Sequence, residues 1–135
     1  MPINFSANNC TTQSSQKRFG LCDDPPPAEN VAYIDEQNGS NWIAVVDNER
    51  RIEVSFVGID HCPEIVLTRA DGTDDSRCDG MLCYEETVVF VELKDRDIYP
   101  SRTWLNKAHK QLLSTIRAFE LCLSLNHAAS HLCHY

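Results

Sequence analysis

The stretch Thr87-Val88-Val89-Phe90-Val91-Glu92-Leu93-Lys94 gives the clearest structural signal in this chain. Its β-branched and aromatic residues predict a strand from Thr87 to Leu93. Alternate side chains of a strand project from the same face, so Glu92 and Lys94 are expected to share one. The pattern therefore predicts a carboxylate and an ammonium group side by side at the end of a strand.

A second strand is predicted just before it, from Cys78 to Tyr84, with Glu85-Glu86 as a two-residue link. Glu-Glu is not a favoured hairpin turn, but its length suits an antiparallel pair. In such a pair the start of the first strand lies beside the end of the second. Asp79 is therefore expected next to Glu92 and Lys94.

These residue types suit a divalent cation and a phosphodiester substrate. Mg²⁺ binds through one or two carboxylates and keeps several waters and phosphate oxygens, which suits Asp79 and Glu92. The main-chain carbonyl of Leu93 is a further candidate ligand. Lys94 could orient or deprotonate an attacking water and offset charge in the transition state. The predicted cofactor is Mg²⁺ or Mn²⁺.

The sequence from Arg102 to about Leu125 predicts an amphipathic helix that packs on the sheet. Its apolar residues recur at intervals of three or four: Trp104, Ala108, Leu112, Ile116, Phe119 and Leu123. A second face carries basic and polar side chains: Lys107, Lys110, Gln111, Ser114 and Arg117. This face could lie along a phosphate backbone, or it could simply be the solvated side of the helix. We predict that Lys107, Lys110 and Arg117 bind nucleic acid.

Asp79, the Glu92-Leu93-Lys94 triplet and a following helix with Gln111 resemble the PD-(D/E)xK nuclease superfamily. The resemblance covers residues 41–135. It implies a single-domain α/β (α+β) protein with a restriction-endonuclease-like fold, in which a central mixed β-sheet is flanked by helices. That fold needs a strand after the helix, and only Ser130 to Tyr135 remain to form it. The domain is therefore expected to be either minimal or cut short at its C-terminus.

The resemblance also implies a function. It implies a metal-dependent endo- or exonuclease that hydrolyses phosphodiester bonds of DNA or of RNA. The implied catalytic residues are Asp79, Glu92, Lys94 and Gln111, and the implied metal ligands are Asp79, Glu92 and the Leu93 carbonyl. The alternative is a catalytically inactive relative with an acidic surface, acting as a binding, immunity or regulatory protein, because one fold hosts many functions. The least specific alternative is a surface strand with an ordinary Glu–Lys pair.

The N-terminal part of the chain gives a weaker signal. Residues 1–40 are polar and include Asp23-Asp24-Pro25-Pro26-Pro27, which predicts an irregular arm or cap outside a core of residues 41–135. Two further strands are predicted from Trp42 to Asp47 and from Ile52 to Ile59.

The charge of the chain argues against a general nucleic-acid coat, because 12 basic and 20 acidic residues give a net charge of -8. The excess is uneven. Residues 61–93 hold eight acidic and two basic residues, whereas residues 94–135 hold three and six. Weak overall attraction implies a nucleic-acid substrate of specific structure, a helper protein or homodimer that aids binding, or no binding of DNA at all. The expected partner is a nucleic acid, most readily DNA.

The seven cysteines include no Cys-x-x-Cys pair. Their odd number and the absence of a secretory signal argue against a disulfide framework, so most are expected to be small buried side chains. No apolar run reaches membrane-spanning length, so no membrane partner is expected. The expected location is the cytoplasm.

Overall fold

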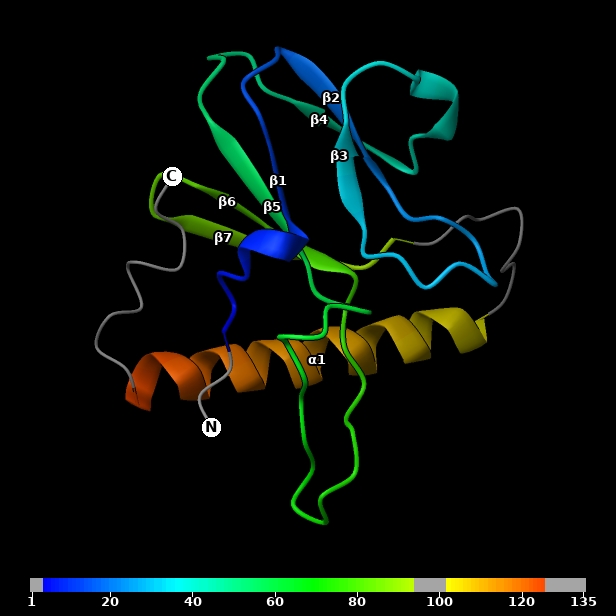
Figure 1. The fold of residues 1–135 in the computed structure, drawn as a ribbon, viewed down its shortest axis with the longest axis vertical. Coiled ribbons are helices and arrows are strands. Elements are labelled where there is room, and N and C mark those ends of the chain that lie inside the picture. The colour runs from blue at the N-terminus through cyan, green and yellow to red at the C-terminus, as the bar shows by residue number, and fades with distance from the viewer. Residues whose placement is uncertain (1–3, 94–101, 126–135) are drawn as a thin grey trace.

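Two antiparallel β-sheets and one long helix make up the described part of the chain, residues 4–93 and 102–125 of a computed structural model (Figure 1). Together they form one small α+β domain. The predicted mixture of helix and strand is confirmed. The predicted mixed sheet is wrong for these residues, because every strand pair in both sheets is antiparallel.

The first sheet has the strand order β1-β5-β6-β7. Its strands are β1 (Thr11–Ser14), β5 (Val54–Gly58), β6 (Gly80–Tyr84) and β7 (Thr87–Val91). The predicted hairpin between β6 and β7 is confirmed, with register pairs from Gly80–Val91 to Tyr84–Thr87. Glu85 adopts a positive φ of 50°, which a tight hairpin turn requires.

The second sheet has the order β3-β2-β4, with β2 (Arg18–Cys22), β3 (Tyr33–Asp35) and β4 (Ala44–Asp47). Two short 3₁₀ helices, η1 (Asn8–Cys10) and η2 (Gly39–Asn41), lie outside the sheets. The prediction of an irregular arm over residues 1–40 is therefore wrong. Three strands fall in that range, and Phe19 and Leu21 of β2 are buried in the core.

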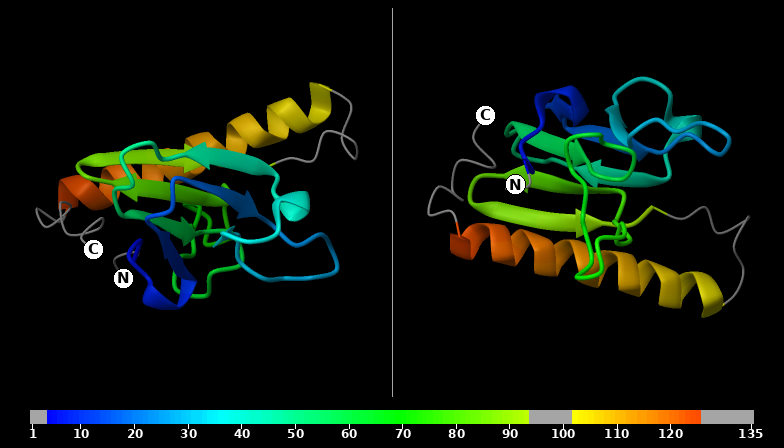
Figure 2. Two further views of the ribbon diagram at one scale, coloured as in Figure 1. Left: turned by 90° about the horizontal axis from the view of Figure 1, so that it is seen from above. Right: turned by 60° about the horizontal axis from the view of Figure 1, so that its bottom comes forward.

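The helix α1 (Arg102–Leu125) is the predicted amphipathic helix. It runs along one face of the first sheet, and the second sheet covers the opposite face (Figure 2). Phe119 of α1 makes edge-to-face ring contacts with Phe5 and with Phe90 of β7, at centroid distances of 5.3 and 5.2 Å. Among the described residues α1 is the one long helix, so helices on both faces are not observed.

Strand β5 lies between two hydrophobic clusters, which explains why all five of its residues are buried. Val57 faces the cluster that includes Phe119, whereas Val54 and Phe56 face the cluster between the sheets. Successive side chains of a strand alternate between faces, so one strand serves both layers. This central strand places Ile59 and Asp60 next to the start of β6.

The cysteines differ from the expectation in one respect. Cys10 and Cys62 form a disulfide, and Cys83 is also disulfide-bonded. The expectation that no disulfides form is therefore wrong, although both cysteines of the first pair are buried as expected. Separately, no helix among the described residues has the length and apolar character that crossing a bilayer requires.

Candidate active site

Asp79 lies directly before β6 and is held from both sides. Its main-chain carbonyl accepts a hydrogen bond from the Ile59 N–H at 2.8 Å, which extends the pairing of β5 and β6 by one step. Its carboxylate Oδ2 accepts a hydrogen bond from the Leu93 N–H at 2.6 Å. The side chain is only 5% exposed. The carboxylate is therefore fixed at the end of the hairpin, where the sequence predicted it.

Glu92 continues the register of β7 opposite Asp79. The last register pair of the hairpin is Gly80 with Val91, so the next residues outward on the two segments are Asp79 and Glu92. Directly opposite residues of antiparallel strands have side chains on the same face. Both carboxylate oxygens of Glu92 are shielded from solvent. The structure thus brings the two predicted carboxylates to one end of the hairpin.

The thiol of Cys78 gives an independent sign of this convergence. Burial is the main cause that raises the pKa of Cys78 to about 12; the hydrogen bond with Thr115 opposes the shift, and the nearby charges of Glu92 and Asp79 add to it. Both carboxylates are therefore close enough to influence the same sulfur. At neutral pH this thiol stays protonated, so Cys78 is not a nucleophile.

Gln111 of α1 lies beside the chain that leads to Asp79, in agreement with the prediction. Its Nε2 donates a hydrogen bond to the Arg77 carbonyl at 3.1 Å, and the residue is 8% exposed. One turn further on, the Thr115 hydroxyl accepts from the Cys78 N–H at 2.8 Å and donates to the Gln111 carbonyl at 2.8 Å. These bonds fix α1 against residues 77–79.

Gly80 is required next to Asp79 because the ring of Phe56 occupies the space of a side chain. A Cβ at Gly80 would lie 2.3 Å from Phe56 Cζ and 2.7 Å from the Val57 carbonyl oxygen. Such distances are well inside van der Waals contact. The Asp79-Gly80 dipeptide therefore allows the acid to sit at the start of a tightly packed strand.

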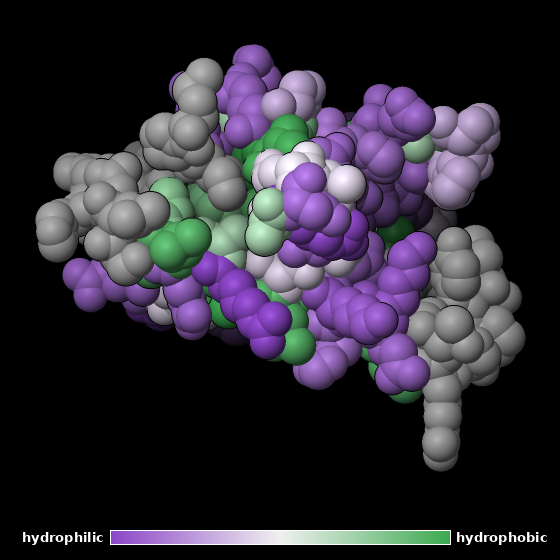
Figure 3. Space-filling model, turned by 90° about the horizontal axis from the view of Figure 1, so that it is seen from below, coloured by the Kyte–Doolittle hydropathy of each residue, from purple (hydrophilic) through white to green (hydrophobic). Residues whose placement is uncertain are grey.

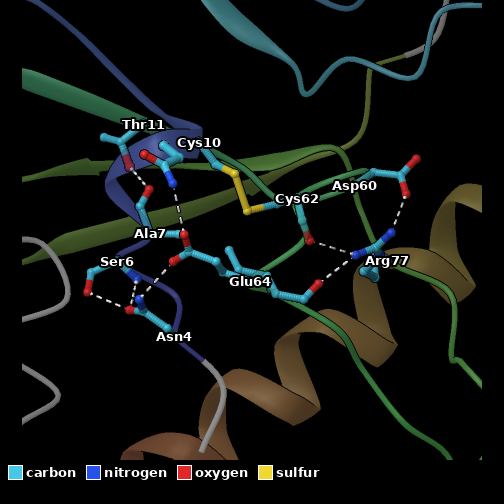
Figure 4. Close-up of a disulfide and its surroundings, with 11 residues drawn as sticks. Asn4, Ser6, Ala7, Cys10, Thr11, Asp60, Cys62, Glu64 and Arg77 are labelled. Atoms are coloured by element: carbon cyan, nitrogen blue, oxygen red, sulfur yellow. Dashed lines mark hydrogen bonds and ion pairs between the residues drawn. A yellow bond between two sulfur atoms is a disulfide. The ribbon is translucent and has the colours of Figure 1, made fainter.

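Arg77 connects distant parts of the loop between β5 and β6, and a disulfide joins this loop to the N-terminal segment (Figure 4). The guanidinium of Arg77 donates to the carbonyls of Ile65 and Cys62, at 2.5 and 3.3 Å, and lies 3.4 Å from a carboxylate oxygen of Asp60. Cys62 is joined to Cys10 at the end of η1. The N-terminal segment thus supports the segment that carries Asp79.

The three basic residues predicted to bind nucleic acid are all exposed on α1. The face of the molecule seen from below is largely hydrophilic, with some hydrophobic areas (Figure 3). At about 100° per residue, Lys110 and Arg117 lie on the side of the helix opposite the buried Thr115. Lys107 lies one turn before Gln111 and is the nearest of the three to the Gln111 side. Binding of nucleic acid by these residues stays a prediction.

Two other predicted residues have different outcomes. Leu93 is 6% exposed and packs in the cluster between the sheets, while its N–H holds Asp79. Lys94 lies outside the described residues, so its predicted role is not addressed by the structure.

Binding of Mg²⁺ or Mn²⁺ at the end of the hairpin stays a prediction. Among residues 4–93 and 102–125, no three Asp, Glu, His or Cys side chains lie close enough to hold one ion together. A structural zinc site would need four such ligands, whereas Mg²⁺ takes one or two carboxylates and keeps its waters. Asp79 and Glu92 would hold such an ion, with the Leu93 carbonyl as a further candidate.

A polar cavity of about 190 Å³ lies beside Gln111. Its polar lining comprises Asp60, Asp74, Asp75, Ser76, Arg77 and Gln111. Three carboxylates outnumber one guanidinium, and that guanidinium is already paired with Asp60. This lining is acidic, whereas the nuclease hypothesis favours an electropositive surround.

Asp23 is a residue that the sequence did not identify. Burial, together with the negative charges of Asp79 and Asp60, raises the pKa of its carboxyl to about 6. It therefore lies within electrostatic reach of the predicted site. The only sequence signal is an acidic residue directly after a strand, and the neighbouring prolines led to the prediction of an irregular arm instead.

Comparison of the chain with protein-family models, with curated proteins and with solved structures gives no match. The functional argument therefore depends on the residues and on their geometry.

Proposed function

We propose that this protein is a metal-dependent nuclease that hydrolyses phosphodiester bonds of DNA or RNA, with a site similar to that of PD-(D/E)xK nucleases. The observation that carries the proposal is the hydrogen bond from the Leu93 N–H to the Asp79 carboxylate. This bond joins one predicted acid to the strand end that carries the other, Glu92. Two carboxylates at one point repel each other, and a bound cation would lower this electrostatic cost.

In the proposed site Asp79 and Glu92 hold Mg²⁺ or Mn²⁺, and the Leu93 carbonyl is a further ligand. A bound divalent cation would make a coordinated water more acidic and offset charge on the phosphate. Asp79 is oriented for binding because its Oδ2 is fixed by a main-chain N–H. Lys94 is assigned to the attacking water, and Gln111 steadies the segment before Asp79 through its bond to the Arg77 carbonyl.

Substrate binding is assigned to Lys107, Lys110 and Arg117 on the exposed side of α1. The net charge of -8 weakens long-range attraction to a polyanion. We therefore assign the enzyme a substrate of specific structure, with a helper protein or a second copy of the chain contributing to binding.

A second candidate function is a catalytically inactive protein that binds a partner through an acidic surface. The acidic lining of the cavity beside Gln111, with Asp60, Asp74 and Asp75, favours this candidate. The two candidates differ in whether a divalent cation is bound and used.

The test is cleavage of single-stranded, double-stranded and branched DNA and of RNA by the full chain, with Mg²⁺, with Mn²⁺ and with a chelator. We expect metal-dependent cleavage that is lost in Asp79→Asn, Glu92→Gln and Lys94→Ala. Glu86→Gln is the matched control, because Glu86 is exposed at the other end of the same hairpin. A wild-type protein that neither cleaves nor binds Mn²⁺ would support the second candidate.

A further inference from the structure

The second sheet is one strand narrower than the first, and a groove lies beside its edge strand β4. The groove has a volume of about 490 Å³. Its lining includes residues of β4 but none of β2, so it lies on the side of β4 that faces away from β2. The apolar lining residues are Val45, Val46, Ile52, Val54, Leu82, Tyr84 and Val89. Val45 and Val89 remain 45% and 40% exposed, so the groove has apolar surface that the described residues leave open.

The edge of β4 also presents main-chain groups that pair with no strand. The Asn48 N–H donates to the Lys17 carbonyl at 2.7 Å, one step beyond the register pair of Arg18 with Asp47. Hydrogen-bonded and non-hydrogen-bonded pairs alternate along antiparallel strands, so the N–H and C=O groups of Val45 and Asp47 point away from β2. Among the described residues these main-chain groups have no hydrogen-bond partner. An extended polypeptide beside β4 would supply the matching donors and acceptors.

The hairpin of β6 and β7 forms an apolar floor for such a strand. Leu82 and Tyr84 pack toward the cluster between the sheets, and Val89 lies on the same face because it is the register partner of Leu82. A strand laid beside β4 would turn alternate side chains onto this floor. The side chains between them would lie next to Val45 and Asp47. Edge strands are commonly protected from pairing by Lys or Pro, and β4 contains neither.

The charged residues around the groove favour a basic occupant. Those in its lining are Asp47, Glu49 and Arg50. Arg50 is paired with Glu85 at 2.8 Å, whereas the Arg18 partner of Asp47 lies at 4.0 Å and both of these side chains are mostly exposed. Glu86, at the hairpin turn, has no ion pair among the described residues. Lysine or arginine side chains of a partner would find carboxylates here, and exposed ion pairs exchange at little cost.

We propose that the groove beside β4 binds an extended segment of another protein, with alternating apolar and basic side chains, as a fourth strand of the second sheet. The free main-chain edge requires an extended backbone, the floor requires apolar side chains, and the acidic rim selects basic ones. A second copy of the chain is a poor occupant, because two chains of net charge -8 repel each other. This inference does not rest on the proposed function.

The experiment adds a capped synthetic peptide of about six residues, in which Val and Lys alternate, to the isotope-labelled full chain. Amide hydrogen exchange at Val45 and Asp47 should slow by roughly tenfold or more in the complex, because their N–H groups gain acceptors. Exchange at Asn48 should change little, because its N–H is already bonded to Lys17. A peptide with Glu in place of Lys should bind roughly tenfold more weakly or worse.

Two substitutions in the groove test the site itself. Val45→Pro removes an N–H that points away from β2, which an edge strand tolerates. Val89→Lys places a cation on the exposed part of the floor. Each should weaken binding of the Val-Lys peptide by roughly tenfold or more. Val66→Lys is the matched control, because Val66 is 42% exposed and lines the other cavity, beside Gln111. Circular dichroism confirms that each variant is folded.

The outcomes distinguish this groove from other binding sites. Slower exchange at Val45 and Asp47, with binding weakened by Val89→Lys but not by Val66→Lys, would support the proposal. If Val66→Lys weakens binding and Val89→Lys does not, the peptide binds at the acidic cavity and the proposal is overturned. Absence of binding by the wild type would overturn it as well. Analytical ultracentrifugation tests for self-association, and a wild-type dimer that Val89→Lys dissociates would replace the partner protein with a second copy.

Discussion

The main-chain N–H of Leu93 donates a 2.6 Å hydrogen bond to Oδ2 of Asp79, so the side chain of one strand end is fixed by the backbone of the other. Asp79→Ala would leave this buried N–H without its acceptor, and the free energy of unfolding should fall by about 1–3 kcal/mol. Asp79→Asn keeps an oxygen that can accept this hydrogen bond, so its free energy of unfolding should fall less. It also removes the negative charge that would bind a cation. Urea unfolding of the two variants measures the difference, and equal losses would contradict it.

The tight packing around Gly80, the residue after Asp79, can be tested by a single substitution. Gly80→Ala places a Cβ against Phe56 and the Val57 carbonyl and should destabilise the fold by about 1–3 kcal/mol, because this part of the core has no room for a methyl group. Gly39→Ala is the control, since the nearest atoms to a Cβ there lie at 3.9 Å. Thermal or urea unfolding compares the two variants. Similar stabilities would mean that Phe56 can move aside.

Local pattern was enough to predict β6, β7 and α1, because each is a continuous segment with its own periodicity. In the second sheet β4 was predicted, within the strand from Trp42 to Asp47, whereas β2 and β3 were missed for a physical reason. Strand β2 pairs with β4, more than twenty residues away, and the close fit of the Trp42 ring over Gly20 depends on that pairing. Nothing in the five residues of β2 predicts which strand they meet.

The residues of the candidate site also fall into those that could be predicted from the sequence and one that could not. Asp79 and Glu92 were predicted to meet because a hairpin of known length sets its own register. Gln111 was named because the resemblance to PD-(D/E)xK nucleases implies a glutamine on the helix that follows the hairpin. Asp23 was not predicted, because its approach to Asp79 depends on how the β2–β3 connection crosses Gly58. Residues that tertiary contacts alone bring to a site leave no local pattern.

The raised pKa of Asp23 predicts a specific dependence of stability on pH. Burial, followed by the charges of Asp79 and Asp60, raises its pKa from 3.8 to about 6 in the folded protein. Between these values the folded state binds more protons than the unfolded state. The contribution of Asp23 to stability is therefore most favourable below pH 3.8, falls as the pH rises to about 6, and is constant above that.

Asp23→Asn removes this penalty. With metal removed by a chelator, we compare the free energy of unfolding of the variant with that of the wild type at two values of pH. The difference in favour of the variant should be larger at pH 7.5 than at pH 4 by about 1 kcal/mol, after allowance for solvent screening of a half-exposed group. Urea unfolding at the two values of pH measures the gain. A difference between variant and wild type that does not change with pH would show that Asp23 is not in the acidic surround described here.

The disulfide between Cys10 and Cys62 joins the N-terminal segment to the loop held by Arg77. It spans a sequence separation of 52, so loss of the bond in Cys10→Ala/Cys62→Ala should lower the free energy of unfolding by about 2–4 kcal/mol. Reduction of this bond should lower the free energy of unfolding of the wild type by a similar amount. The variant lacks the bond and should not show this loss. Cys122→Ala is the control, because Cys122 packs against the same hydrophobic cluster but is not part of this disulfide. Mass spectrometry after alkylation shows whether the pair is oxidised. Disulfides persist mainly in oxidising compartments. A fully reduced pair in protein isolated from its source would therefore agree with the expected cytoplasmic location.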